Sequence, residues 1–98
     1  MPVKYNFEWD HKKDLDNRNK HDVAFEEAAT IFKDTGALTI FDPDHSLVED
    51  RWITMGISFT GRMLVVIHTF REEGEGSISI RIISSGKATK REIQTYRR

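Results

Sequence analysis

Four side chains between positions 49 and 81 are of the types that acid–base chemistry on a phosphate group requires. Glu49 and Arg51 stand at the start of one apolar segment, and His68 and Arg81 lie inside two later ones. RNA can be cut without a metal because its own 2′-hydroxyl attacks the neighbouring phosphate, so a protein need supply only a base, an acid and cations. We therefore predict a catalytic cluster of Arg51, His68 and Arg81, with Glu49 as the candidate base.

Each of these residues also has a purely structural interpretation. His68 shares the register of apolar neighbours, and a histidine in that setting is more often a hydrogen-bonded core residue than a titrating one. Arg51 could form a weak surface ion pair instead of clamping a phosphate with its planar fork. For Arg81, which lies between two isoleucines, a salt bridge to the acidic part of the chain and a phosphate contact are equally compatible with the sequence.

The charges of the chain are unevenly distributed. Residues 81–98 hold six Lys or Arg and a single acid, whereas residues 1–80 hold nine Lys or Arg and fifteen Asp or Glu, although the net charge is only −1. Such a basic segment is an electrostatic footprint for a phosphate backbone or an acidic partner, unless it is simply a solvated helix face. We predict that Lys87, Lys90 and Arg91 contact RNA, together with Arg62 from a tight turn, although a solvated turn residue is the simpler interpretation of Arg62.

The segment Asp42-Pro43-Asp44-His45 gathers three side chains that can bind a metal. Two carboxylates and a histidine this close can meet a divalent ion, but Asp and Pro also favour turns. The four histidines of the chain show neither i, i+4 nor His-x-His spacing, and the sequence has no cysteine and no glycine-rich phosphate loop. We therefore expect a turn here, and neither a metal nor a cofactor.

A length of 98 residues predicts a single domain spanning residues 1–98. No apolar run approaches the ~20 residues that a bilayer span needs, and the first residues lack the apolar segment of a signal peptide. The absence of cysteine fits a reducing compartment. We expect a cytoplasmic protein with no membrane partner.

Apolar periodicity predicts the elements that would position these residues. Strands are expected at 3–8, 37–41, 51–59, 63–70 and 77–84, and helices at 10–20, at 25–33 and from 90 to the C-terminus. The short links between the last four strands favour an antiparallel meander. The predicted fold is therefore an α+β domain, in which an antiparallel meander sheet of four to five strands has one face covered by two N-terminal helices and one C-terminal helix.

Two local expectations bear on the candidate site. The helix at 10–20 carries Leu15 as its only aliphatic residue, so it should rest weakly on the core. Ser85-Gly86 should turn the chain out of the last strand, before a Thr89-x-x-Glu92 capping box starts the final helix.

An ordered series of short motifs resembles the BrnT family of toxins. The series consists of Phe7-Glu8-Trp9-Asp10, Lys13, Asn17, Lys20-His21, Phe25-Glu26-Glu27-Ala28, Asp42-Pro43-Asp44-His45, Glu49, Arg51, Gly61-Arg62, Val65-Val66, Arg81-Ile82-Ile83-Ser84, Lys87-Ala88-Thr89, Glu92 and Tyr96. It spans residues 7–96, nearly the whole chain. No single motif is specific, whereas their order is.

The resemblance implies a RelE-like ribonuclease toxin of a bacterial type II toxin–antitoxin system, which cuts RNA and so blocks translation. It also implies a partner, a BrnA-type antitoxin with a ribbon-helix-helix DNA-binding part. Toxin and antitoxin would form a heterotetramer that contacts operator DNA only through the antitoxin.

This chain departs from the family pattern at one position. The family commonly carries Ile-Ser-Ala-Arg where this chain has Ile83-Ser84-Ser85-Gly86. The missing arginine implies a weakened nuclease, or replacement by Lys87, whose point charge lacks the guanidinium fork. Two functions stay open: an active endoribonuclease, or a catalytically weakened homologue that binds the antitoxin and regulates its operon. A direct DNA-binding regulator is a third and weaker hypothesis, because no DNA-reading helix stands out.

Overall fold

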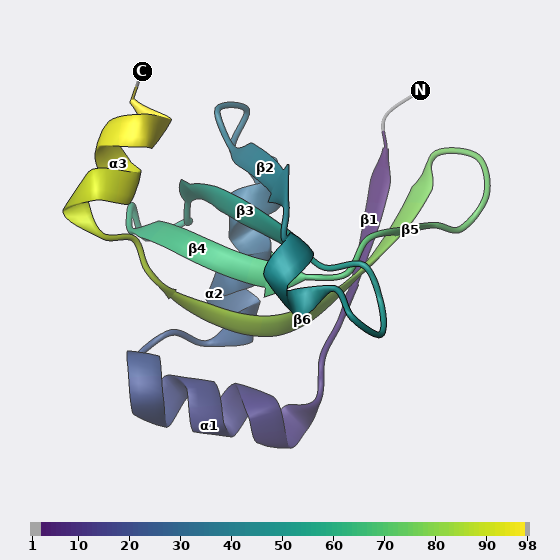
Figure 1. Cartoon of the computed structure of the whole chain (residues 1–98), viewed down its shortest axis with the longest axis horizontal. Coiled ribbons are helices and arrows are strands. Elements are labelled where there is room, and N and C mark those ends of the chain that lie inside the picture. Colours follow the sequence, from purple (N-terminus) through teal and green to yellow (C-terminus); the bar gives the residue numbers. More distant parts are fainter. Residues whose placement is uncertain (1–2, 98) are drawn as a thin grey trace.

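The computed structural model of the chain describes residues 3–97 (Figure 1). Its elements in chain order are β1 (Lys4–Glu8), α1 (His11–His21), α2 (Phe25–Ala29), the 3₁₀ turn η1 (Thr30–Lys33), β2 (Leu38–Phe41), the 3₁₀ turn η2 (Pro43–His45), β3 (Trp52–Ile57), β4 (Met63–His68), β5 (Arg71–Glu72), β6 (Ser77–Lys87) and α3 (Lys90–Tyr96). No helix among these residues is both long and apolar enough to cross a membrane.

The strands form one sheet in the order β1-β6-β4-β3-β2, with β5 paired to β6 beside this path. The predicted antiparallel meander is confirmed for β2, β3, β4 and β6. β1 instead runs parallel to β6, with Phe7 opposite Ile80; alternation reveals the two faces of a strand but not its partner. The α+β class is confirmed, and the described sheet has six strands rather than four to five because residues 71–72 form β5.

The main core lies between α2 and one face of the sheet, which we call the helix face and define by Leu64, Val66, Ile80 and Ile82. These four side chains are buried together with Phe25, Ala28 and Ile31 from α2 and η1. The apolar spacing expected for a helix at 25–33 is confirmed, although its second half is the tighter η1. Burial of several large apolar side chains at ~1.5–3 kcal/mol each fixes the sheet against α2.

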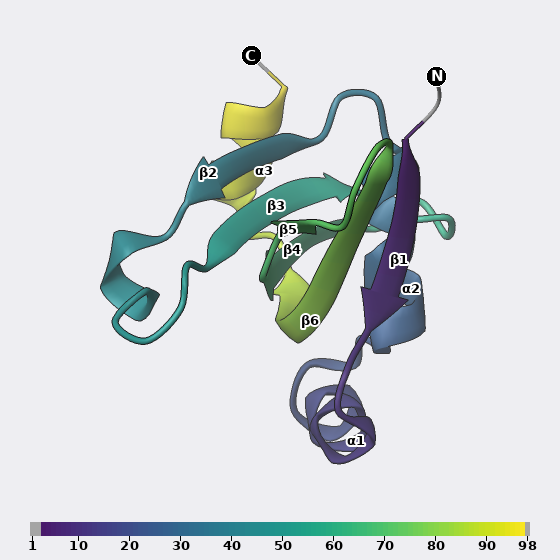
Figure 2. The ribbon, with the colours of Figure 1, turned by 90° about the vertical axis from the view of Figure 1, so that its right-hand side faces the viewer.

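α3 packs on the opposite side of the sheet, which we call the open face and define by Ile53, Val65 and Arg81. Two α3 residues, Glu92 and Thr95, line a groove with Ile53, Val65 and their open-face neighbours. In Figure 2, α2 lies on the right next to β1, and α3 lies on the left behind β2 and β3. The expectation that all helices cover one face is therefore wrong for α3, because apolar periodicity does not reveal on which face of a sheet a helix packs.

The start and the end of α3 are both held by specific hydrogen bonds. The predicted capping box is confirmed: the Thr89 hydroxyl accepts from Glu92 N at 3.2 Å, and the Glu92 carboxylate accepts from Thr89 N at 2.7 Å. At the other end, the Tyr96 hydroxyl donates to the Asp34 carboxylate at 2.6 Å. This bond lowers the pKa of Asp34 and raises that of Tyr96.

α1 is anchored by buried polar side chains rather than by apolar ones. Asn17 donates to the carbonyls of Val23 and Ser85, each at 2.8 Å, and accepts from Ser85 N at 3.1 Å. Asp14, also buried, accepts from Phe25 N at 2.9 Å. The expectation that α1 rests weakly on the core is wrong, because hydrophobic periodicity does not register polar anchors of this kind.

β6 continues through the predicted turn at Ser85-Gly86. The strand stays paired with β4 as far as Lys87, which lies opposite Leu64. Asn17 binds both backbone polar groups of Ser85, so the strand is held from α1 as well as from β4. The predicted turn is therefore wrong: these small residues lie in an extended strand.

A bulge in β6 changes which side chains face which side of the sheet. Ile67 pairs with Ser84 whereas His68 pairs with Ile82, so Ile83 is an extra residue. Because side chains alternate along a strand, the extra residue inverts the alternation. Arg81 consequently belongs to the open face, whereas Lys87 belongs to the helix face.

Candidate active site

Three of the four predicted catalytic residues meet on the open face. Glu49, in the loop before β3, accepts a hydrogen bond from the Arg81 guanidinium in the middle of β6. The same Glu49 oxygen lies 3.9 Å from Nη2 of Arg51, which directly precedes β3. All three side chains are partly exposed, with between 31% and 43% of their surface accessible. We call Glu49, Arg51 and Arg81 the carboxylate–arginine cluster.

Glu49 and Arg81 of the cluster line an open pocket of about 210 Å³, whereas Arg51 is not among its lining residues. Its lining residues are Glu8, Glu49, Asp50, Thr69, Phe70, Arg71, Ser79 and Arg81. The pocket is smaller than the ~300–1,000 Å³ of a drug-sized ligand site, so it suits a fragment such as a phosphate with its sugar. The lining contains three acids and two arginines. A phosphate in the pocket therefore needs a cation that is not already paired with one of these acids.

Arg51 is the cation of the cluster with unused donors. Within residues 3–97 its side chain donates no hydrogen bond, since the 3.9 Å between its Nη2 and Glu49 is too long for one. Its Nε is buried without a partner. Arg81, in contrast, already donates to Glu49. A guanidinium carries five N–H donors in a planar fork that matches a phosphate, and a buried donor without a partner is costly. Arg51 is therefore the member of the cluster best prepared to take an anionic ligand.

His68, the fourth predicted catalytic residue, lies on the helix face with 1% of its surface exposed. Its Nε2 lies 2.7 Å from the Thr54 hydroxyl, its Nδ1 lies 2.8 Å from the Thr69 carbonyl, and its ring packs edge-on against Phe32. The carbonyl can only accept, so Nδ1 carries the proton and Nε2 accepts from Thr54. Burial lowers the pKa of His68. The structure does not bring His68 to the cluster.

Arg62 forms an ion pair with Glu27 that uses most of its donors. Its guanidinium donates to the two Glu27 oxygens at 2.9 Å and 2.5 Å, and to the Asp22 carbonyl at 3.0 Å. The Arg62 hydrogen bond is the main cause that lowers the pKa of Glu27 to about 2, assisted by the Ser58 and Thr60 hydroxyls. The pair connects the β3–β4 turn to α2 behind the sheet, away from the cluster.

The other predicted RNA contacts divide between the two sides of the molecule. Lys87 Nζ lies 3.7 Å from the Asp22 carboxylate, on the helix face. Lys90 and Arg91 are exposed in the first turn of α3 and have no ion-pair partner within residues 3–97. Lys87 lies six positions after Arg81 in β6, which is ~20 Å along an extended chain. The basic C-terminal segment is therefore not one continuous wall beside the cluster.

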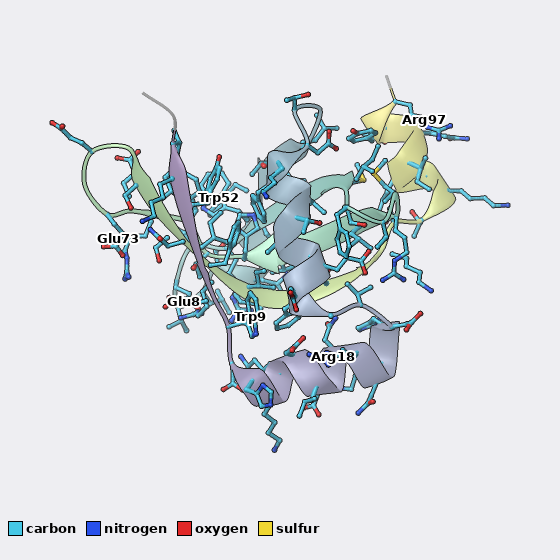
Figure 3. All side chains as sticks on the ribbon, turned by 180° about the vertical axis from the view of Figure 1, so that it is seen from behind. Glu8, Trp9, Arg18, Trp52, Glu73 and Arg97 are labelled. Carbon is cyan, nitrogen blue, oxygen red and sulfur yellow. The ribbon has the colours of Figure 1, made fainter. Side chains whose placement is uncertain are left out.

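Figure 3 shows the same separation from behind the sheet. Arg97, at the end of α3, lies on one side of the molecule, and Glu8, the register partner of Arg81, lies on the other. Arg98, counted in the basic segment, lies outside the described residues.

Sequence reasoning missed one polar pair beside the cluster. His45 Nδ1 lies 2.7 Å from Oδ2 of Asp42, whose side chain is buried, while the His45 side chain is 59% exposed. The expected turn is confirmed, since residues 43–45 form η2. The Asp42-x-x-His45 spacing was the signal in the sequence that could have indicated this pair, but the Asp and Pro content of the segment favoured a turn. Within residues 3–97 no three His, Asp or Glu side chains gather as metal ligands would.

Comparisons with known proteins agree with this architecture. The family model described as "Ribonuclease toxin, BrnT, of type II toxin-antitoxin system" matches residues 9–92. The crystal structure of the Brucella abortus ribonuclease toxin, BrnT, superposes with a TM-score of 0.52 at 22% identity, covering 92% of this chain and 99% of that one. At that identity the superposition establishes a shared fold alone. No curated protein matches the sequence.

Proposed function

This chain belongs to the BrnT family of ribonuclease toxins of type II toxin–antitoxin systems, and from that membership we propose that it is a metal-independent endoribonuclease with a RelE-like fold. In this proposal it acts in the bacterial cytoplasm and blocks translation by cutting RNA. The observation that supports the proposal most is the carboxylate–arginine cluster on the open face, where Arg51 has unused donors beside the ion-paired Glu49.

We assign the cluster residues distinct roles. Arg51 clamps the scissile phosphate and stabilises the charge that develops on it. Glu49 is the general base that takes the proton of the attacking 2′-hydroxyl. Arg81 is a positioning residue, because its hydrogen bond fixes the Glu49 carboxylate. Lys90 and Arg91 steer RNA toward the open face by long-range attraction.

The remaining predicted site residues receive structural roles in this proposal. Arg62 and Lys87 bind the acids of the α1–α2 corner, and Arg62 has few donors left for a phosphate. His68 is enclosed between Thr54 and the Thr69 carbonyl, so it supports the sheet and does not reach the substrate.

We further propose that a BrnA-type antitoxin with a ribbon-helix-helix part neutralises the chain, in a heterotetramer that contacts DNA only through the antitoxin. Family membership is the basis of this proposal. The apolar groove between α3 and the open face, which includes Leu38 and Ile40, supports it because it leaves apolar surface uncovered in the isolated chain.

A second candidate function rests on Gly86, where the family arginine is absent. In that case the chain is a weakened toxin that serves mainly to bind the antitoxin and regulate the operon. Induced expression in bacteria, with and without the antitoxin, distinguishes the two candidates. An active nuclease arrests growth when expressed alone, and Glu49→Gln relieves the arrest at equal protein level. Normal growth with the unsubstituted chain would leave the binding-module function.

A further inference from the structure

Cleavage by the mechanism above also needs a general acid for the leaving 5′-oxygen, and the carboxylate–arginine cluster does not contain one. Arg51 and Arg81 stay protonated throughout, and Glu49 is engaged as the base. Histidine is the side chain that most readily donates and accepts a proton near neutral pH. His68 is enclosed on the other face, and His11 and His21 lie in α1. The remaining histidine is His45.

We propose that His45, oriented by Asp42, is the general acid of the ribonuclease site. This inference rests on the proposed function of the cluster. The buried Asp42 carboxylate lies 2.7 Å from Nδ1 and can only accept when ionised, so Nδ1 donates to it and Nε2 is left for another partner. Within residues 3–97 Nε2 has no hydrogen-bond partner. A carboxylate that orients one ring nitrogen while the other meets substrate is the arrangement that proton-transferring histidines use.

The fold brings this pair to the same face as the cluster. Asp42 N donates to the Arg51 carbonyl at 2.9 Å, so Asp42 lies directly opposite Arg51 where β2 and β3 meet the loop. The register that places Ile40 opposite Ile53 puts Asp42 and Arg51 on the open face. In Figure 1 the short helical turn between β2 and β3, which contains His45, lies in front of β4 and β6, on the side away from α2.

The loop that carries His45 is held by its own hydrogen bonds. The Ser46 hydroxyl donates to the Asp42 carbonyl at 2.5 Å and accepts from Arg51 N at 3.0 Å. The backbone on both sides of His45 is therefore tied to the residue that clamps the phosphate. These bonds hold the backbone around His45 in place relative to Arg51, and proton-transfer catalysis depends on such fixed positions.

The proposed step balances as a transesterification. The 2′-oxygen loses its proton to Glu49 and bonds to phosphorus, while the bond from phosphorus to the 5′-oxygen breaks and that oxygen takes the Nε2 proton of the His45 imidazolium. The products are a 2′,3′-cyclic phosphate and a 5′-hydroxyl. Afterwards Glu49 is protonated and His45 neutral, and exchange with water restores both.

The test uses two RNA substrates that differ in one atom. In one, the bridging 5′-oxygen at a mapped cleavage site is replaced by sulfur, and the resulting thiolate leaves without protonation. His45→Gln is expected to cut ordinary RNA ~10²–10⁴-fold more slowly than the unsubstituted chain. On the sulfur substrate the same variant should differ by only a few-fold. Asp42→Asn should show a smaller loss with the same sulfur rescue, and His11→Gln should match the unsubstituted chain on both.

Each result decides the inference. Wild-type rates for His45→Gln on ordinary RNA would overturn it, as would equal losses on both substrates, since those indicate a structural role. If His45→Gln does not fold, the rates of Asp42→Asn on the two substrates provide the same test. Absence of cleavage of both substrates by the unsubstituted chain would overturn the proposed function itself, which is a result distinct from the other two.

Discussion

Glu49 accepts a hydrogen bond from Arg81, a residue 32 positions further along the chain. The bond joins the loop before β3 to the middle of β6, two parts of the chain that are separated in the sheet by β4. Because Arg81 neutralises Glu49, the neighbouring Arg51 keeps its own donors for a ligand. The relationship explains how the open face presents, next to a carboxylate, a guanidinium that donates no hydrogen bond within residues 3–97.

Removal of Arg81 should slow cleavage without preventing folding. Arg81→Ala leaves Glu49 unfixed, so we expect kcat to fall ~10–100-fold, within the range that single positioning contacts contribute. Arg81→Lys should recover part of the rate because it restores the charge but not the fork. Rates are measured on a defined RNA with excess EDTA. Lys33→Ala, which removes a positive charge from η1, is the matched control, and equal losses in both variants would contradict the role of Arg81.

Gly86→Arg should raise the cleavage rate. Gly86 lies on the open face opposite Val65, and a Cβ built there meets no atom within 4 Å. The Cβ of a larger residue is therefore accommodated there, and an arginine would add a phosphate-binding fork to the face that carries the cluster. We expect kcat/KM to rise at least ~10-fold.

Gly86→Ala separates this effect from strand propensity. Alanine should change the free energy of unfolding by less than ~1 kcal/mol and leave the rate unaltered. If Gly86→Arg folds but cuts no faster than Gly86→Ala, the missing arginine does not account for any weakness of this chain.

The Glu27–Arg62 pair should act on stability and not on RNA. Glu27→Gln removes charge from two hydrogen bonds and should lower the free energy of unfolding by ~1–3 kcal/mol at pH 7. The pKa of Glu27 falls from 4.5 to about 2 on folding, so its contribution is full above pH 4.5 and is lost as the pH falls toward 2. Urea unfolding at several pH values measures this, with exposed Glu75→Gln as control. A difference between variant and wild type that stayed constant to pH 2 would argue against the pair.

His68 should make the fold sensitive to mild acid. Burial holds its pKa below the ordinary 6.5, so the unfolded chain binds a proton that the folded chain resists. Stability should therefore decline as the pH falls below about 6.5. His68→Gln should flatten this decline between pH 7.5 and 5.5 in urea unfolding, whereas His21→Gln on α1 should keep it. An identical slope for wild type and His68→Gln would refute the assignment.

Local patterns in the sequence predicted where the helices and strands lie better than which of them pair or pack with one another. The alternation in 51–59 and 63–70 and the capping box at Thr89 describe interactions between near neighbours, and the structure contains all of them. The parallel pairing of β1 and the position of α3 depend on contacts between distant residues, which periodicity does not encode. Ser85-Gly86 looks like a turn by composition, but Asn17, 68 positions away, holds it in a strand.

The candidate site could be predicted in part for the same reason. Arg81 stood out because a charged residue inside a strand needs a partner, and Glu49 and Arg51 stood out at the start of an apolar segment. In the structure Glu49 pairs with both arginines. The sequence does not reveal that the basic C-terminal segment is divided between the two faces. The extra residue Ile83 in the β6 bulge places Lys87 on the helix face. His45 was visible in the sequence, but only the fold reveals its hydrogen bond to the buried Asp42 and the pairing of Asp42 with Arg51.

Cleavage of one end-labelled RNA by the unsubstituted chain and by Arg51→Ala, at equal folded concentration and in excess EDTA, tests the central claim most directly. We predict that the unsubstituted chain produces fragments with 2′,3′-cyclic phosphate ends, and that Arg51→Ala lowers kcat/KM by ~10²–10³-fold while its unfolding midpoint stays close to that of the unsubstituted chain. Cleavage by Arg51→Ala at the unsubstituted rate, or intact RNA with both proteins, would contradict the account.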